Sequence, residues 1–106
     1  MEELEQQIFE IITHSGSARA MLYEALTEVQ KGDVVKADEL MDSSSKEMTL
    51  AHNVQTKLIT ADMNGGTKIS LLLIHAQDQL MTTMSEQTII EQMIKMQKEI
   101  NELKNK

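Results

Sequence analysis

The sequence contains no cysteine and no proline, and its only aromatic residues are Phe9 and Tyr23. Without cysteine the chain cannot form disulfides, thiolate zinc sites or a cysteine nucleophile. Two aromatic rings give little support for stacking against nucleic acid bases. A membrane-spanning helix needs an apolar run of about 18 residues, and the longest run here extends only from Leu71 to Ile74. Phosphate-binding glycine loops and His-Glu-x-x-His metal motifs are also missing.

Basic residues are scarce as well, with 10 Lys and Arg against 17 Asp and Glu, for a net charge of −7. Nucleic acid binding needs clustered basic side chains, so the composition argues against it. An acidic surface is better suited to a basic protein partner. The N-terminus is acidic, with Glu2, Glu3 and Glu5, where a signal peptide would be basic. We therefore expect a soluble, cytoplasmic protein.

The length of 106 residues fits one domain, spanning 1–106, with a single modest core. Glycine occurs only at positions 16, 32, 65 and 66, so two strong breaks separate three long segments. Apolar residues in the first segment recur at alternating intervals of four and three, as do those in the second, which includes two polar positions, Ser44 and Gln55. The first set is Leu4, Ile8, Ile11, Ser15, Ala18, Leu22, Ala25 and Val29, and the second is Ala37, Met41, Ser44, Met48, Ala51, Gln55 and Leu58. The pattern predicts an all-α, antiparallel three-helix bundle.

The breaks have recognisable turn chemistry. Gly32 followed by Asp33 is typical of a glycine that ends one helix and an aspartate that caps the next, so we expect the second helix to begin at Val34. After Gly65 and Gly66, Thr67 is the expected N-cap of the third helix. Gly16 interrupts helix propensity without breaking the periodicity, which predicts a kink or a close contact there.

The third segment carries two apolar stripes on nearly opposite sides. The first stripe is Ile69, Leu73, Ala76, Leu80, Thr83, Ile90 and Ile94, and the second is Leu71, His75, Asp78, Thr82, Ile89, Met93, Met96 and Ile100. One apolar face is enough for a helix in a monomeric bundle, so the second stripe implies a partner on the far side. We infer a symmetric oligomer whose third helices meet near the axis.

His75 and Asp78 both belong to the second stripe, because residues three apart share a helix face. A neutral imidazole offers a lone pair that can attack phosphorus, which makes a histidine on a groove a natural phosphoryl relay. The alternative is a core histidine whose ring is satisfied by Asp78. His14 and His52 fit structural roles better, although His52 could neighbour a site.

In a symmetric oligomer, Asp78 would bring one carboxylate per subunit to the axis. Like charges there require a shared proton or a cation such as Mg²⁺ held by oxygen ligands. The alternative is an exposed carboxylate paired with a basic residue.

Several segments resemble the lactose/cellobiose-type enzyme IIA family of the bacterial sugar phosphotransferase system, over roughly residues 8–95. They are Leu72-Leu73-Ile74-His75-Ala76-Gln77-Asp78-Gln79-Leu80-Met81, Ala51-His52-Asn53-Val54-Gln55-Thr56-Lys57-Leu58-Ile59, Tyr23-Glu24-Ala25-Leu26, Ser17-Ala18-Arg19 and Lys31-Gly32-Asp33. The histidine segment and the Ala-His-x-x-Gln-Thr segment are the most specific.

The resemblance implies a homotrimer in which His75 is catalytic, taking phosphate from phospho-HPr and passing it to a cysteine of the cognate IIB component during β-glucoside or disaccharide uptake. It also implies that Asp78 binds a divalent metal, expected to be Mg²⁺, on the trimer axis. The family commonly has a second histidine where this chain has Gln79. We consider Gln79 and Gln55 as candidates to orient the imidazole or bind phosphoryl oxygens.

Two other functions compete with a phosphocarrier. A non-catalytic trimeric interaction module would explain the composition and the stripes, but not an imidazole and a carboxylate in the second stripe. A metal-storage or di-metal oxidase bundle lacks the required Glu-x-x-His ligand pairs on facing helices.

Overall fold

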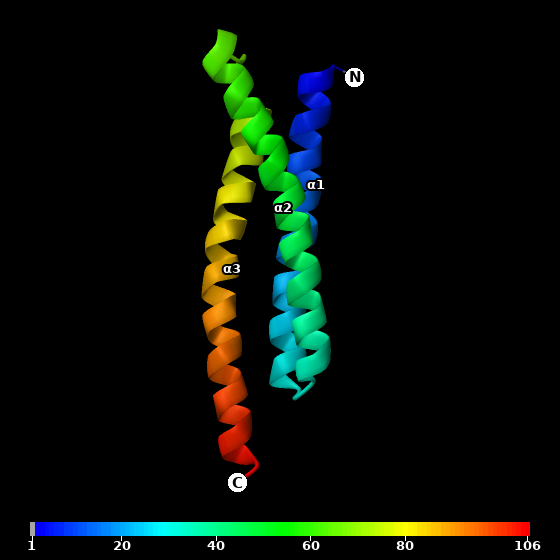
Figure 1. Cartoon of the computed structure of the whole chain (residues 1–106), viewed down its shortest axis with the longest axis vertical. Helices are drawn as coiled ribbons and strands as arrows, with labels where there is room; N and C mark the ends of the chain where they lie inside the picture. The colour runs from blue at the N-terminus through cyan, green and yellow to red at the C-terminus, as the bar shows by residue number, and fades with distance from the viewer. Residues whose placement is uncertain (1) are drawn as a thin grey trace.

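The structure, a computed structural model, describes residues 2–106 and has three helices and no strand in that range. Helix α1 spans Glu3–Gln30, α2 spans Val34–Gly65 and α3 spans Leu71–Lys104. Together they form a rod of 61 × 21 × 19 Å (Figure 1). The predicted all-α fold with three helices is confirmed.

Helices α1 and α2 run antiparallel and lie side by side, and α3 runs back in the same direction as α1, so the two termini are at opposite ends of the rod (Figure 1). Helix α3 packs extensively against α1 and only sparsely against α2. The side of the molecule between α2 and α3 is therefore the less tightly closed one.

The predicted stripes of α1 and α2 form the core. Every predicted position is buried except Leu4 and Met41, which are half-buried. Ile11 and Leu22 are completely inaccessible to solvent, and burying an aliphatic side chain of that size stabilises the fold by about 1.5–3 kcal/mol. The spacing of apolar residues thus identified the contact faces of the first two helices.

The two polar positions in the α2 stripe are paired with other helices. Ser44 is fully buried and its Oγ donates to the carbonyl of Ala18 on α1 at 2.9 Å. Gln55 is almost fully buried and its Nε2 donates to Oε1 of Gln77 on α3 at 2.6 Å. A buried polar group without a partner would cost about 1–3 kcal/mol, so these bonds explain why the core tolerates both side chains.

The first turn forms as predicted. Gly32 has a φ of +93°, which a residue with a Cβ rarely adopts. Asp33 caps α2, accepting from the backbone N–H of Lys36 at 3.0 Å. Helix α2 accordingly begins at Val34.

The prediction that Thr67 caps the third helix is wrong. Ser70 is the N-cap of α3, and its Oγ accepts from the N–H of Leu73 at 3.1 Å. The backbone N–H of Thr67 instead donates to Oδ1 of Asp62 at 2.7 Å, which folds the connection back onto the end of α2. Both threonine and serine can cap a helix, so the choice depends on the path of this connection.

The two stripes of α3 have different surroundings. In the first stripe Ala76, Leu80, Thr83, Ile90 and Ile94 are buried, whereas Ile69 precedes the helix and is exposed. All eight positions of the second stripe are exposed in the single chain. None of the helices described is long and apolar enough to cross a membrane.

Candidate functional site

His75 lies in the second turn of α3, where the Ser70 cap sets the start of the helix. Its side chain is exposed. No residue from 2 to 106 forms a hydrogen bond with the ring. The alternative of a core histidine satisfied by Asp78 is therefore wrong for the single chain, and the imidazole is open to a visiting molecule.

Asp78 is also exposed, and its carboxylate forms no ion pair with the described basic residues. The alternative, in which Asp78 is an exposed carboxylate paired with a basic residue, is therefore wrong for the single chain. Its backbone is paired within the helix, and its carbonyl also accepts from the hydroxyl of Thr82 at 2.7 Å. His75 and Asp78 thus share an exposed face of α3, and each keeps its polar atoms available.

The same face continues as an apolar band toward the C-terminus. Ile89 is 56% exposed and Met96 is 59% exposed. Met93 and Ile100 lie along the same band and are exposed too. Their own chain leaves them uncovered, as the prediction of a second contact face requires.

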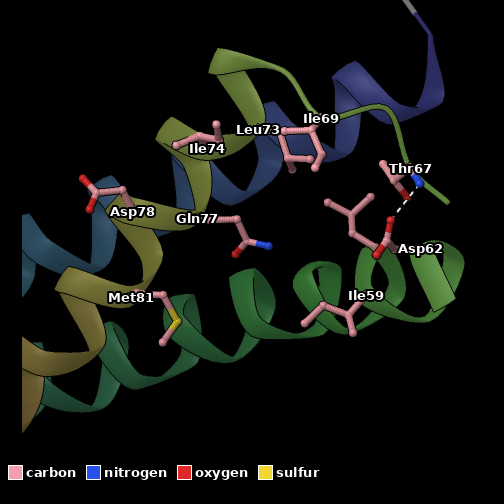
Figure 2. Close-up of a pocket in the computed structure, with 10 residues that line it drawn as sticks. Ile59, Asp62, Thr67, Ile69, Leu73, Ile74, Gln77, Asp78 and Met81 are labelled. Atoms are coloured by element: carbon pink, nitrogen blue, oxygen red, sulfur yellow. Dashed lines mark hydrogen bonds between the residues drawn. The ribbon is translucent and has the colours of Figure 1, made fainter.

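A mostly apolar groove of about 540 Å³ opens between the end of α2, the connection after it and the first turns of α3 (Figure 2). Figure 2 shows Gln77 pointing toward α2 across this groove, whereas Asp78 points away from α2. The residues that line the groove are Leu58, Ile59, Asp62, Thr67, Ile69, Leu73, Ile74, Gln77, Asp78 and Met81. An apolar depression therefore begins beside the turn that carries His75 and Asp78.

The two glutamines expected to assist the histidine are used differently. Gln55 is committed to Gln77, with a further contact of 3.7 Å from its Nε2 to the sulfur of Met81. Gln79 is half-buried and faces α1, where its Nε2 would lie 3.2 Å from a Cβ placed on Gly16. Neither side chain bonds to His75 in the described structure. The close contact predicted at Gly16 is confirmed, with Gln79 as the neighbour.

The other two histidines lie elsewhere. Nδ1 of His14 is 2.5 Å from Oε2 of Glu47, which links α1 to α2, so the structural interpretation of His14 holds. Its partner could not be found from helical spacing because it is on another helix. His52 is exposed and lines a separate depression of about 200 Å³ with Met84 and Gln87 of α3.

A polar cluster that the sequence pattern did not predict lies between α1 and α3. Arg19 Nε lies 2.7 Å from Glu86 Oε2, and its guanidinium also donates to the hydroxyl of Thr82. Tyr23 donates to the other oxygen of Glu86 at 2.5 Å. One signal could have revealed it, since Arg19 is the single arginine among 106 residues.

The hydrogen bond from Tyr23 to Glu86 raises the pKa of the tyrosine hydroxyl above its ordinary value. Desolvation and the negative charge of the same carboxylate raise the pKa further, and the nearby positive charge of Arg19 opposes this shift. The tyrosine therefore keeps its proton, and its hydrogen bond to Glu86, to a higher pH than an ordinary tyrosine would.

The donor set for a metal is small. In the part of the chain that the structure describes, no three His, Asp or Glu side chains converge on one point. Asp78 offers one carboxylate, the hard oxygen ligand that Mg²⁺ prefers. A single chain therefore cannot enclose the ion, and a site would need Asp78 from several copies.

Comparison with known proteins matches residues 6–98 to the family described as the PTS system, Lactose/Cellobiose specific IIA subunit. The N,N'-diacetylchitobiose-specific EIIA component of Escherichia coli is 42% identical over 100 residues, which cover 93% of this chain and 86% of that protein. The lactose-specific EIIA component of Lacticaseibacillus casei is 36% identical over 106 residues, covering 99% of this chain and 95% of that one.

Solved structures agree with the sequence relatives. The cellobiose-specific enzyme IIA of Bacillus anthracis superposes with a TM-score of 0.91 at 37% identity, covering 95% of this chain and 94% of that one. The chitobiose IIA protein in its solution complex with HPr superposes with a TM-score of 0.84 at 39% identity, covering 95% and 99%. Sequence and fold agree, and the chain belongs to the lactose/cellobiose-specific IIA family of the sugar phosphotransferase system.

Proposed function

We propose that this chain is a phosphocarrier that accepts a phosphoryl group from phospho-HPr on His75 and passes it to a cysteine of the cognate IIB component during β-glucoside or disaccharide uptake. The observation that carries the proposal is the exposed, unpartnered imidazole of His75 in a member of this family. The complex of HPr with the chitobiose IIA protein, whose fold this chain shares, supports HPr as the donor.

Each transfer step exchanges one bond to phosphorus for another. The lone pair of a neutral His75 nitrogen attacks the phosphorus of phospho-HPr, and the bond between phosphorus and the donor breaks as the new N–P bond forms. In the second step a thiolate of IIB attacks the same phosphorus and His75 leaves with its electron pair. The absence of cysteine from this sequence fits a thiol supplied by another polypeptide.

The surroundings of His75 favour this chemistry by access and position. The phosphoryl group brings about −1.5 to −2 charges at neutral pH. His75 lies on an exposed face of α3, so a phosphoryl group on its ring would remain hydrated. The adjacent apolar groove offers a contact surface that would hold a partner protein while the group is transferred.

The exposed band of α3 supports assembly into a homotrimer, with the third helices near the axis. Ile89, Met93, Met96 and Ile100 would pack against the same residues of two neighbours. Asp78 would then face its symmetry mates, and three carboxylates fit a divalent cation such as Mg²⁺. When bound, the ion would neutralise charge near the phosphorylated histidine, and Asp78 would hold it.

The test is to incubate the purified protein with phosphoenolpyruvate, enzyme I and HPr, and to measure the intact mass. The expected result is one acid-labile phosphate per chain, and omission of HPr should abolish it. A protein that acquires no phosphate under these conditions would act instead as a non-catalytic interaction module.

A further inference from the structure

Arg19 is the only arginine of the chain, and it bridges α1 to the helix that carries His75. Its guanidinium donates to the hydroxyl of Thr82, and it makes a longer contact of 3.5 Å with the carbonyl of Gln79. Its Nε and Glu86 Oε2 are 2.7 Å apart and sealed from solvent, without the alignment of a hydrogen bond, so they attract each other as charges.

Glu86 is itself held in place. One carboxylate oxygen faces Arg19 and the other accepts from Tyr23 at 2.5 Å. Tyr23 lies one turn after Arg19 on α1. The guanidinium, which comes from α1, is therefore held by groups of α3, and Tyr23 of α1 holds one of them, Glu86, in turn. About a third of the Arg19 side chain is exposed.

The residues of α3 that contact Arg19 lie in one row along the helix with His75, called here the His75 column. Gln79, Thr82 and Glu86 follow His75 at successive intervals of four, three and four residues, which is the spacing of one helix face. The backbone N–H of Gln79 pairs with the carbonyl of His75 in a regular α-helix. The carbonyl of Gln79 accepts from the hydroxyl of Thr83 at 2.7 Å, and the contact of 3.5 Å from Arg19 reaches the same oxygen.

Few other polar side-chain contacts join the N-terminal part of α3, which carries His75, to the other helices. Helix α3 packs sparsely on α2, where Gln55 and Gln77 provide a cross-link beside the open groove. At the far end of α3, Asn101 donates to the carbonyl of Val29 at 2.9 Å, and Lys98 pairs with Asp38 at 3.0 Å. The Arg19 cluster is thus the charged attachment next to the turn that carries His75.

We propose that Arg19 is a positioning residue of the phosphoryl relay, an inference that rests on the proposed function. By holding the Gln79 carbonyl, the Thr82 hydroxyl and Glu86 together, it fixes the rotation and height of the His75 column relative to α1. A planar guanidinium can bind three groups in different directions, which the compact ammonium of a lysine cannot do with the same geometry. Displacing an attacking group by about 1 Å can slow a reaction by about a hundredfold.

The test compares Arg19→Lys and Thr82→Val with wild type in steady-state phosphotransfer from phospho-HPr. Both variants should lower kcat by about tenfold or more, which is less than the roughly hundredfold loss expected for a displacement of about 1 Å. The KM for phospho-HPr should stay within about twofold of wild type. Thr82→Val removes one hydroxyl from an exposed position, so it folds even if the arginine variant does not. The matched control is Lys98→Met, which removes the ion pair at the far end of α3 and should leave kcat unchanged.

The outcomes separate this inference from the proposed function. If wild type takes up phosphate and both variants keep the wild-type kcat, the positioning role is wrong and the relay stands. If Lys98→Met lowers kcat as much as the variants do, the effect is general loosening of the bundle and the inference is also overturned. If wild type takes up no phosphate, the relay itself is wrong.

Discussion

Gly16 of α1 and Gln79 of α3 lie against each other, so that a Cβ built on the glycine would be 3.2 Å from the amide nitrogen of Gln79. That contact occurs one turn after His75, on the α1 side of its helix. The absence of a side chain at Gly16 therefore allows the amide to occupy this position between the two helices.

Gly16→Ala should stabilise the fold slightly. Replacing glycine by alanine within a helix gains about 1 kcal/mol, and the end of the Gln79 side chain can move a few tenths of an ångström to make room. Urea denaturation followed by circular dichroism measures the change. Gly16→Leu is the control, because a larger side chain should collide with α3 and lower the free energy of unfolding.

His75→Gln should abolish phosphate uptake and leave the helices intact. The amide has no nucleophilic nitrogen, and His75 is exposed with no intramolecular bond to lose. Intact mass after incubation with phosphoenolpyruvate, enzyme I and HPr gives the result. His52→Gln, which changes an exposed histidine of α2 in a separate depression, should take up phosphate normally. Phosphate on the His75 variant would show that another residue accepts the group.

Asp78→Leu should preserve or strengthen self-association. Converging carboxylates repel one another, and leucine would extend the apolar band instead. Sedimentation velocity should show assembly that depends on Mg²⁺ for wild type and does not depend on it for the variant. Asp42→Leu is the control, because Asp42 lies on α2 and pairs with Lys46. A monomeric Asp78→Leu protein would contradict an axial position for this residue.

Ile89→Glu combined with Met96→Glu should convert the proposed trimer to monomers. Two charges per chain would have to be buried at the contact, which costs far more than the lost apolar area contributes. Val35→Glu provides the comparison, because Val35 is 71% exposed at the start of α2 and lies outside the band. Equal sedimentation of the double variant and wild type would place the contact face elsewhere.

High pH should weaken the cluster around Arg19. The pKa of Tyr23 is raised by its bond to Glu86, so the folded state holds this proton more tightly than the unfolded chain does. The stabilising contribution is complete below the ordinary tyrosine pKa of about 10 and is lost as pH rises through the higher pKa of the folded state.

The absorbance of the tyrosinate measures this titration directly, because the sequence has one tyrosine and no tryptophan. The midpoint should be higher in the native protein than in urea, and Glu86→Gln should lower it. Equal midpoints in native protein and urea would mean that the bond to Glu86 does not persist in solution.

The sequence alone determined the three helices, the first turn and the core faces of α1 and α2. These follow from local rules, since the 4-3 spacing defines a helix face and glycine followed by aspartate ends one helix and caps the next. It also singled out His75 and Asp78, because ionisable groups are conspicuous in an apolar stripe.

The tertiary structure decided which polar groups meet across helices. Three such pairs join residues that are far apart in the sequence, and no periodicity connects them. They are His14 with Glu47, Gln55 with Gln77 and Arg19 with Glu86. It also moved the cap of α3 from Thr67 to Ser70, because Asp62 draws the connection back toward α2. Helix periodicity fixes the direction of a side chain around its own axis, whereas the rotation and height of neighbouring helices depend on the packing of the whole bundle.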